Sequence, residues 1–369
     1  MRLSKCSVDS NELKALEDVL KSEYFGTGPK TKQFEDDLRD FFQNDNYDLV
    51  CTNTGTSAIQ LAIQASNFPP HSEIIVPTLT YVASFQAITA AGHIPIPCDI
   101  NPVNGLLSIN DAKKRISDKT AGIMLVHYNG YAGNLDEYYS FAKKNNLRVI
   151  EDAAHAFGST YKNHLIGTIG DIACFSFDGI KNITCGEGGL VISKDKKLIN
   201  NIRDLRLLGV KGDSNNREQS KRTWDLDVEE QGWRYHMSDI MASIGIEQLK
   251  KFKSIFKKKR MELNKYFREN LQNCKYVTLF ETDLDNVVPH IFPIRFEKSK
   301  INKLREELSK NDIPTGIHYR PNHLLTFFKS SYKLKNAELV YKELITLPFH
   351  VDISRNEIDK ICQIIKQID

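Results

Sequence analysis

One stretch, residues 147–193, constrains the fold of this chain more than any other. It reads LRVIEDAAHAFGSTYKNHLIGTIGDIACFSFDGIKNITCGEGGLVIS and contains two short apolar runs, Leu147–Ile150 and Ile172–Phe177. Each run has the length of a buried strand and ends in polar residues. Asp152 follows the first run, and Lys181 follows the second, ahead of a glycine-rich turn. In open α/β sheets, ligands bind at the carboxyl ends of the parallel strands, so this stretch predicts a ligand site.

An acid and a lysine at two strand ends meet the requirements of pyridoxal phosphate. The lysine forms a Schiff base with the cofactor, and a carboxylate keeps its pyridine nitrogen protonated. Asp152 is preferred over Glu151 because neighbouring residues of a strand face opposite sides of the sheet. Lys181, once released by the substrate amine, can carry a proton as a general acid and base. Ser176 is positioned to contact the cofactor phosphate. Taken singly, such a lysine is more often a surface charge and such an aspartate a cap, so the prediction depends on their combination.

A second anchor for the phosphate is predicted near the N-terminus. The strand Tyr47–Cys51 runs into the turn TNTGTS and a helix over residues 58–65. The free N–H groups and the dipole of a helix N-terminus favour a phosphate, and Gly55 allows the backbone to approach it closely. Gly55 and Thr56 are therefore candidate cofactor contacts. The alternative is that Thr54 or Thr56 is simply an N-cap.

Strands and helices alternate along most of the chain, which predicts an α/β fold. We expect a large domain with a mostly parallel sheet flanked by helices on both faces, followed by a smaller C-terminal α+β domain. The boundary is placed inside a long helical pattern over residues 238–271, which divides the chain into residues 1–245 and 246–369. The further strands expected in the large domain are Glu73–Pro77, Ile94–Asp99 and Ala121–Val126.

Composition excludes several classes of function. A formal charge of +3 over 369 residues gives no reason to expect nucleic acid or an anionic membrane as a partner. The seven cysteines form no C-x-x-C pair, which indicates reduced thiols in a cytoplasmic protein, and no metal site is expected. No apolar run approaches the roughly 20 residues of a membrane helix, and the N-terminus lacks the apolar core of a signal peptide.

Seven motifs, in order, carry a family resemblance. From about Gly26 to the C-terminus, the chain resembles the DegT/StrS family of sugar-nucleotide aminotransferases, which are fold-type I pyridoxal phosphate enzymes. No single motif would be specific for the family, but the seven motifs in this order are. The matching segments are GTGPKTKQFE, NTGTSAIQLA, EIIVPTLTYVAS, EDAAHAFGSTYK, GTIGDIACFSFDGIKNITCGEGG, MSDIMASIGIEQL and GIHYRP.

The resemblance implies roles for individual residues. Lys181 matches the Schiff-base lysine of the family, and Asp152 matches the carboxylate at the pyridine nitrogen. His155 stands where the family often has Gln or His near the cofactor's 3′-oxygen. Tyr81 matches the aromatic residue that stacks on the ring, although by itself it reads as a core or rim tyrosine. The family's phosphate contacts correspond to Gly55, Thr56 and Ser176.

One segment departs from the family pattern. Many members read Gly-x-Asn-x-Arg-Met before the long helix, and their Asn reaches across a dimer interface to the neighbouring cofactor's phosphate. This chain reads GWRYHM, so Arg234 takes the Asn position and His236 replaces the Arg. An arginine can serve a phosphate at least as well as an asparagine. His318 and Tyr319 match a segment near the sugar nucleotide in the family; the alternative is an ordinary strand end.

The implied reaction moves an amino group from L-glutamate to a nucleotide-linked keto-deoxyhexose (EC 2.6.1), in a homodimer with shared active sites. GWRYHMSDI resembles members that act at C4, which favours a dTDP-4-keto-6-deoxyhexose for surface polysaccharide, such as lipopolysaccharide O-antigen, or glycan. UDP and GDP sugars and amination at C3 remain alternatives. A sugar dehydratase or a regulatory protein without catalysis should lack Lys181 or Asp152. An amino-acid aminotransferase needs an arginine clamp, for which Arg234 and Arg320 are candidates.

Overall fold

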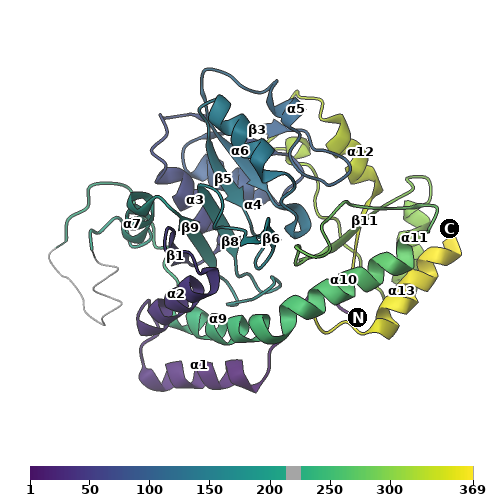
Figure 1. Ribbon diagram of the computed structural model, residues 1–369, viewed down its shortest axis with the longest axis horizontal. Helices are drawn as coiled ribbons and strands as arrows, with labels where there is room; N and C mark the ends of the chain where they lie inside the picture. The colour runs from purple at the N-terminus through teal and green to yellow at the C-terminus, as the bar shows by residue number, and fades with distance from the viewer. Residues whose placement is uncertain (213–225, 369) are drawn as a thin grey trace.

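The central element of the structure is a seven-stranded sheet with helices on both faces (Figure 1). The structure is a computed structural model that describes residues 1–212 and 226–368. Polar turns precede and follow short apolar strands, as the sequence predicts. In spatial order, the strands are β1 (Asp48–Thr52), β9 (Gly189–Ser193), β8 (Ile172–Ser176), β5 (Arg148–Asp152), β4 (Thr120–Val126), β2 (Glu73–Pro77) and β3 (Ile94–Cys98).

The predicted, mostly parallel sheet is confirmed, with one strand of opposite direction. β9 lies between β1 and β8 and is antiparallel to both, with Leu190 opposite Cys51 on one side and Phe175 on the other. The sequence analysis did not identify this strand. Only a loop joins β8 to β9, and an antiparallel neighbour can be reached by a short connection, whereas a parallel one needs a crossover.

Two sets of helices bury the two faces of the sheet. One buried cluster contains side chains of α3 (Gly55–Gln64), α4 (Val82–Ala90) and α7 (Lys196–Leu205). The cluster on the other face contains side chains of α2 (Pro29–Phe42), α6 (Leu135–Lys144) and α9 (Asp239–Lys251). We call these the α3 face and the α2 face.

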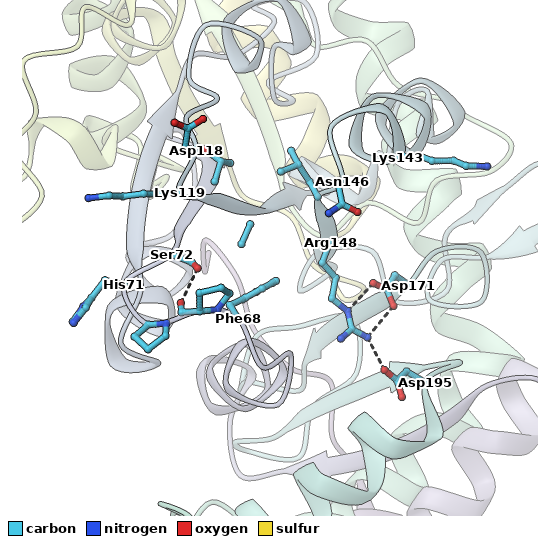
Figure 2. Close-up of a pocket in the computed structure, with 15 residues that line it drawn as sticks. Phe68, His71, Ser72, Asp118, Lys119, Lys143, Asn146, Arg148, Asp171 and Asp195 are labelled. Carbon is cyan, nitrogen blue, oxygen red and sulfur yellow. Dashed lines mark hydrogen bonds and ion pairs between the residues drawn. The ribbon is translucent and has the colours of Figure 1, made fainter.

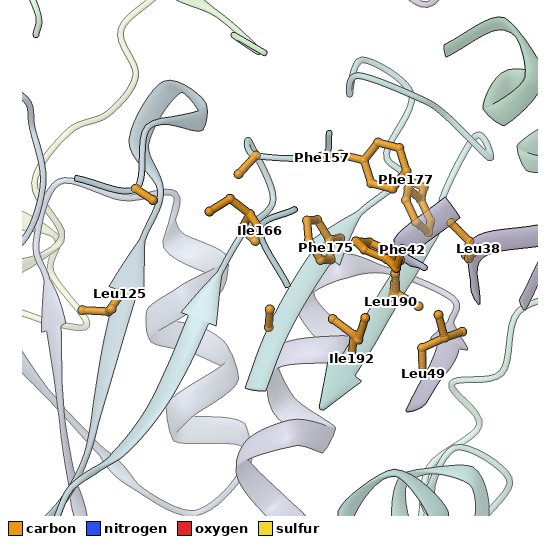
Figure 3. Packing of buried hydrophobic residues seen from close by; sticks show 14 of the residues in the cluster. Leu38, Phe42, Leu49, Leu125, Phe157, Ile166, Phe175, Phe177, Leu190 and Ile192 are labelled. Atoms are coloured by element: carbon orange, nitrogen blue, oxygen red, sulfur yellow. The ribbon is translucent and has the colours of Figure 1, made fainter. Parts of the chain in front are cut away.

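Successive side chains of β8 point alternately to the two faces of the sheet. One set packs in the hydrophobic core, and the other set faces the side that carries the candidate site. Phe175 and the following Phe177 point to the α2 face, where Phe175 packs with Phe42 at a ring-centroid distance of 5.6 Å (Figure 3). Burial of each such ring stabilises the fold by about 1.5–3 kcal/mol. Cys174 belongs to the α3 face. Ser176, two residues later, faces the same way, and this is the side on which the candidate site lies.

A long helical rod runs beside the sheet. It consists of α9, a π-helical turn (Phe252–Phe256) and α10 (Lys257–Leu271), which Figure 1 shows in line. The helical pattern predicted over residues 238–271 is therefore confirmed, apart from the π turn. α1 (Ser10–Ser22) lies outermost and packs on α9.

The C-terminal part has its own small sheet and core. β10 (Val277–Leu279), β11 (Phe292–Phe296) and β12 (Leu344–Leu347) form an antiparallel sheet. Its buried cluster comes only from residues 263–368. The helices of this part are α11 (Ile301–Lys310), α12 (Lys335–Glu343) and α13 (Arg355–Ile368).

One segment of the C-terminal part returns to the large sheet. The side-chain amide of Asn322 donates hydrogen bonds to the carbonyls of Thr78 and Thr80, which directly follow β2. This contact brings the preceding residues, His318 and Tyr319, over the carboxyl ends of the large sheet. Within the described ranges, each helix is too short or too polar to span a lipid bilayer.

Candidate active site

A cavity of about 450 Å³ opens at the carboxyl ends of β4, β5 and β8. Three elements of the large sheet and the returning C-terminal segment contribute its walls. Of the residues predicted from the sequence, all but Arg234 line it: Gly55, Thr56, Tyr81, Asp152, His155, Ser176, Lys181, His318 and Tyr319.

Asp152 faces the cavity and Glu151 faces away from it, as the alternation of a strand predicts. The Asp152 carboxylate accepts hydrogen bonds from the Ser84 hydroxyl (2.7 Å) and the Ala154 N–H (3.2 Å). On the opposite face, the Glu151 carboxylate contacts the His127 ring and the Tyr139 hydroxyl, each at 2.6 Å. Of these two adjacent acids, Glu151 is bonded within the core on one face of the sheet, and only Asp152 can contact a ligand in the cavity.

Lys181 lies in the loop after β8, partly buried in the wall of the cavity. Burial lowers the pKa of Lys181 to about 8, against the opposing effect of the Asp152 and Asp178 carboxylates. A lysine with a pKa this low has a substantial neutral fraction near physiological pH. The neutral amine is the nucleophilic form, so Lys181 is suited to attack an aldehyde.

The start of α3 forms one end of the cavity. Thr54 is the N-cap, and its hydroxyl accepts a hydrogen bond from Ser57 N–H, so the N-cap alternative holds for Thr54. Thr56 is exposed and lines the cavity. A Cβ at Gly55 would lie 2.7 Å from the Cβ of Ser176, so only glycine allows the helix to start this close to the end of β8. The helix N-terminus and the Ser176 hydroxyl together suit an anion.

His155 is neutral, and its hydrogen bonds define which nitrogen carries the proton. The Asn129 N–H donates to Nδ1 of His155 (3.4 Å), so the proton is on Nε2, which donates to the Tyr319 hydroxyl (2.9 Å). Burial, together with nearby Lys181, holds the pKa of His155 well below its usual range. Burial raises the pKa of Tyr319, so this hydroxyl keeps its proton and can donate it to a ligand.

Two further histidines complete the wall. Nδ1 of His318 pairs with the Thr346 hydroxyl at 3.0 Å, and burial lowers the pKa of His318 to about 4. His290, which the sequence analysis did not single out, is buried with its ring centroid 4.6 Å from that of His155. Burial holds the pKa of His290 well below its usual range as well. No local sequence signal identifies His290, because it reaches the site only through the packing of β11.

Tyr81 lies at the rim of the cavity. Its side chain is 58% exposed, and its ring centroid is 5.6 Å from that of Tyr319. The ring is therefore free to cover a flat ligand. Thr80, which the sequence analysis also left out, lines the cavity beside it.

Arg234 lies outside this cavity and is exposed. The rings on either side of it, Trp233 and Tyr235, stack at 5.5 Å and hydrogen-bond to Gln64 and Gln60 of α3. Because both neighbours pack on α3, the Arg234 side chain points away from it. Arg234 forms no ion pair within the described residues.

The residues of the cavity fit pyridoxal phosphate. A carboxylate held by two donors suits a pyridinium nitrogen, and a lysine of low pKa suits an aldehyde. The helix N-terminus at Gly55 suits the phosphate. The fold and the site thus define an aminotransferase-like enzyme with its cofactor site at the carboxyl ends of an α/β sheet.

A larger hollow, of about 1,030 Å³, lies at the opposite, amino ends of the strands (Figure 2). Its central side chain, Arg148, is already paired with Asp171 (2.9 Å) and Asp195 (2.8 Å). The Ser72 hydroxyl there donates to the Pro69 carbonyl. These side chains satisfy one another, so this hollow shows no chemistry comparable with that of the smaller cavity.

Comparison with known proteins identifies the family. The model of the DegT/DnrJ/EryC1/StrS aminotransferase family matches residues 7–366, so the chain belongs to this family. The uncharacterized protein MJ1066 of Methanocaldococcus jannaschii is 34% identical over 373 residues, with 98% of this chain and 95% of the relative covered. The spore coat polysaccharide biosynthesis protein SpsC of Bacillus subtilis is 28% identical, with the same coverage.

A solved structure supports the same assignment. The putative sugar aminotransferase Spr1654 of Streptococcus pneumoniae has a TM-score of 0.91 and 28% identity, with 100% of this chain and 98% of that chain covered. It has been solved in PLP and PMP forms, that is, with the cofactor as the aldehyde and as the amine that carries the amino group. The predicted family and fold class are therefore confirmed.

Proposed function

We propose that this protein uses pyridoxal phosphate to transfer an amino group from L-glutamate to the C4 keto group of a dTDP-4-keto-6-deoxyhexose, for a surface polysaccharide or glycan. Membership of an aminotransferase family supports the reaction class, and the named sugar aminotransferase and polysaccharide relatives support a sugar acceptor. The observation that carries the proposal is that Lys181 and Asp152 line one cavity with the N-terminus of α3, which suits an anion.

When bound, the cofactor withdraws electrons from the carbon next to the transferred nitrogen and makes its proton removable. Lys181 would hold the cofactor and then move that proton, and its low pKa makes it a competent base. Asp152 would keep the pyridine nitrogen protonated. Neutral His155 and the protonated Tyr319 hydroxyl would orient oxygens of the cofactor and the sugar without adding charge.

The charge of the cavity supports a site completed by a second copy of the chain. Among the described residues that line it, the carboxylates Asp152, Asp178 and Glu187 outnumber the one cation, Lys181, because the histidines are neutral. The proposed cofactor, donor and nucleotide are all anions. We infer that Arg234, exposed between two residues that pack on α3, supplies the missing positive charge to the site of a partner subunit.

The first test is the visible absorbance of the purified protein before and after addition of L-glutamate. We expect a yellow band from lysine-bound cofactor, which glutamate bleaches; Lys181→Ala should lack the band. A yellow band that no amino donor changes would contradict transamination. Screening keto sugars linked to dTDP, UDP and GDP, with NMR of the product, then tests the nucleotide and amination at C4 against amination at C3.

The shared site has its own test. Lys181→Ala and Arg234→Ala should each be inactive or nearly so as homodimers. If they are unfolded together and refolded as a mixture, hybrid dimers should regain activity, because one of their two sites carries both native residues. A mixture no more active than its components would contradict the delivery of Arg234 across an interface. Lys181→Ala mixed with Lys181→Arg is the matched control and should stay inactive.

A further inference from the structure

A pair of buried hydroxyls, those of Ser84 and Thr80, lies beside Asp152 at the wall of the cavity. Ser84, on α4, is fully buried and donates to Oδ2 of Asp152 at 2.7 Å. A carboxylate can only accept, so the single hydroxyl proton of Ser84 is committed to Asp152. The Thr80 hydroxyl lies 2.9 Å from the Ser84 oxygen. Since Ser84 has no second proton, Thr80 must be the donor, and the chain of donation runs from Thr80 to Ser84 to Asp152.

This chain is held rigidly from the C-terminal part. The Thr80 carbonyl accepts a hydrogen bond from the side-chain amide of Asn322 (2.8 Å), and the same amide donates to the Thr78 carbonyl (3.1 Å). The Thr78 hydroxyl contacts His323 at 2.8 Å. The segment that brings His318 and Tyr319 to the cavity is therefore bound to the same turn that fixes Thr80.

We propose that Ser84, backed by Thr80, is a positioning residue that keeps the Asp152 carboxylate oriented as an acceptor, so that the proton between Asp152 and the cofactor's ring nitrogen stays on the nitrogen. This inference rests on the proposed function. A donated hydrogen bond stabilises a carboxylate and lowers its proton affinity. With the Ala154 N–H on Oδ1 and the Ser84 hydroxyl on Oδ2, each oxygen of Asp152 has a fixed donor and still keeps a lone pair that can meet the ring. No covalent step is involved; only the resting place of one proton is set.

The test is the ¹⁵N chemical shift of pyridoxal phosphate labelled at the ring nitrogen and bound to the protein. The wild type should show the shift of a protonated ring nitrogen. Ser84→Ala should move the resonance toward the unprotonated value and lower kcat by roughly ten- to hundredfold, with little change in KM for the amino donor, because one hydrogen bond to a charge is lost. Ser84→Thr keeps the hydroxyl and should restore both.

A second variant and a matched control separate this role from a merely structural one. Thr80→Val keeps the shape of the side chain and should move the resonance in the same direction by a smaller amount. Ser72→Ala removes another buried hydroxyl, at the opposite end of β2, and should leave the shift and kcat unchanged. An unchanged ¹⁵N shift in folded Ser84→Ala, or a wild-type ring nitrogen that is already unprotonated, overturns the proposal. A wild type that takes up no cofactor overturns the proposed function and this inference with it.

Discussion

Two hollows lie at opposite ends of the same sheet, and the smaller one holds the candidate active site. At the amino ends, Arg148 is paired with two aspartates, and the neighbouring charged side chains face solvent. At the carboxyl ends, a lysine, three neutral histidines and an acid held by Ser84 converge on less than half the volume. The smaller hollow is the candidate active site because titratable side chains are buried together there, and not because of its volume.

The difference follows from the topology of a parallel sheet. Asp152 and Ser176 are the last residues of β5 and β8, and the loop after β8 carries Lys181, so all three reach a common space at the carboxyl ends of the strands. At the amino ends, the chain passes from the helices back into the strands. The polar side chains there pair with one another or face water. Burying a polar group without a partner costs free energy. At the carboxyl ends, a bound ligand can supply the missing partner, and functional sites therefore tolerate such groups.

The largest expected difference between the two hollows is the effect of losing a lysine from each. Lys181→Ala should lower turnover by at least about a thousandfold, because both the attachment point and the proton carrier are removed. Lys143→Ala, in the amino-end hollow, should leave turnover unchanged. Steady-state kinetics of the two variants measure this. Similar losses in both would break the comparison.

The second largest effect that we expect is a change in the rate of cofactor uptake with pH. Because burial lowers the pKa of Lys181 to about 8, the neutral amine accumulates as pH rises to about 8 and then levels off. Below that pH, the rate of uptake should rise about tenfold per pH unit. The histidines of the cavity stay neutral throughout, so they should add no second step.

Asp178→Asn sharpens this prediction. The Asp178 carboxylate raises the pKa of Lys181, so its removal should move the midpoint to lower pH. Stopped-flow absorbance after mixing cofactor-free protein with pyridoxal phosphate gives both midpoints. A midpoint that stays in place, or moves up, would show that Asp178 does not act on Lys181.

A smaller effect is expected from replacing a glycine by alanine beside each of the two hollows. The Cβ of Gly55→Ala would lie 2.7 Å from the Ser176 Cβ, so this variant should bind the cofactor about tenfold or more weakly and lose about 1–3 kcal/mol of stability. At the other end, the Cβ of Gly122→Ala would lie 3.3 Å from the Phe68 ring and 3.4 Å from the Arg148 carbonyl. Its cost should stay below about 1 kcal/mol. Cofactor titration and urea unfolding test the pair, and equal effects would refute the close packing at Gly55.

The smallest effect is expected at Arg148 itself. Arg148→Ala removes two partly exposed ion pairs and should lower the free energy of unfolding by about 1 kcal/mol or less, with kcat unchanged. Urea unfolding in low and high salt measures this, since salt should reduce the difference between the variant and the wild type. A loss of kcat would give the amino-end hollow a role in catalysis.

The local sequence predicted the parts of this protein that depend on neighbouring residues. The apolar runs before Asp152 and Lys181 gave strands in the right places, and strand alternation distinguished Asp152 from Glu151. The N-cap of α3 was recognisable from the TNTGTS turn. These features were predictable because strand period and helix capping act over a few residues. The seven ordered motifs predicted the family, which the family comparison confirmed.

Only the tertiary structure decided the rest. β9 enters between β1 and β8 in the opposite direction, a placement that the sequence analysis did not identify. His290 and the Thr80–Ser84 pair reach the site through contacts between distant segments, and the bond from Ser84 to Asp152 spans 68 positions of the chain. The exposure of Arg234 follows from the packing of its neighbours on α3. Such contacts depend on how whole elements pack, and packing is a property of the folded chain that no short stretch of sequence contains.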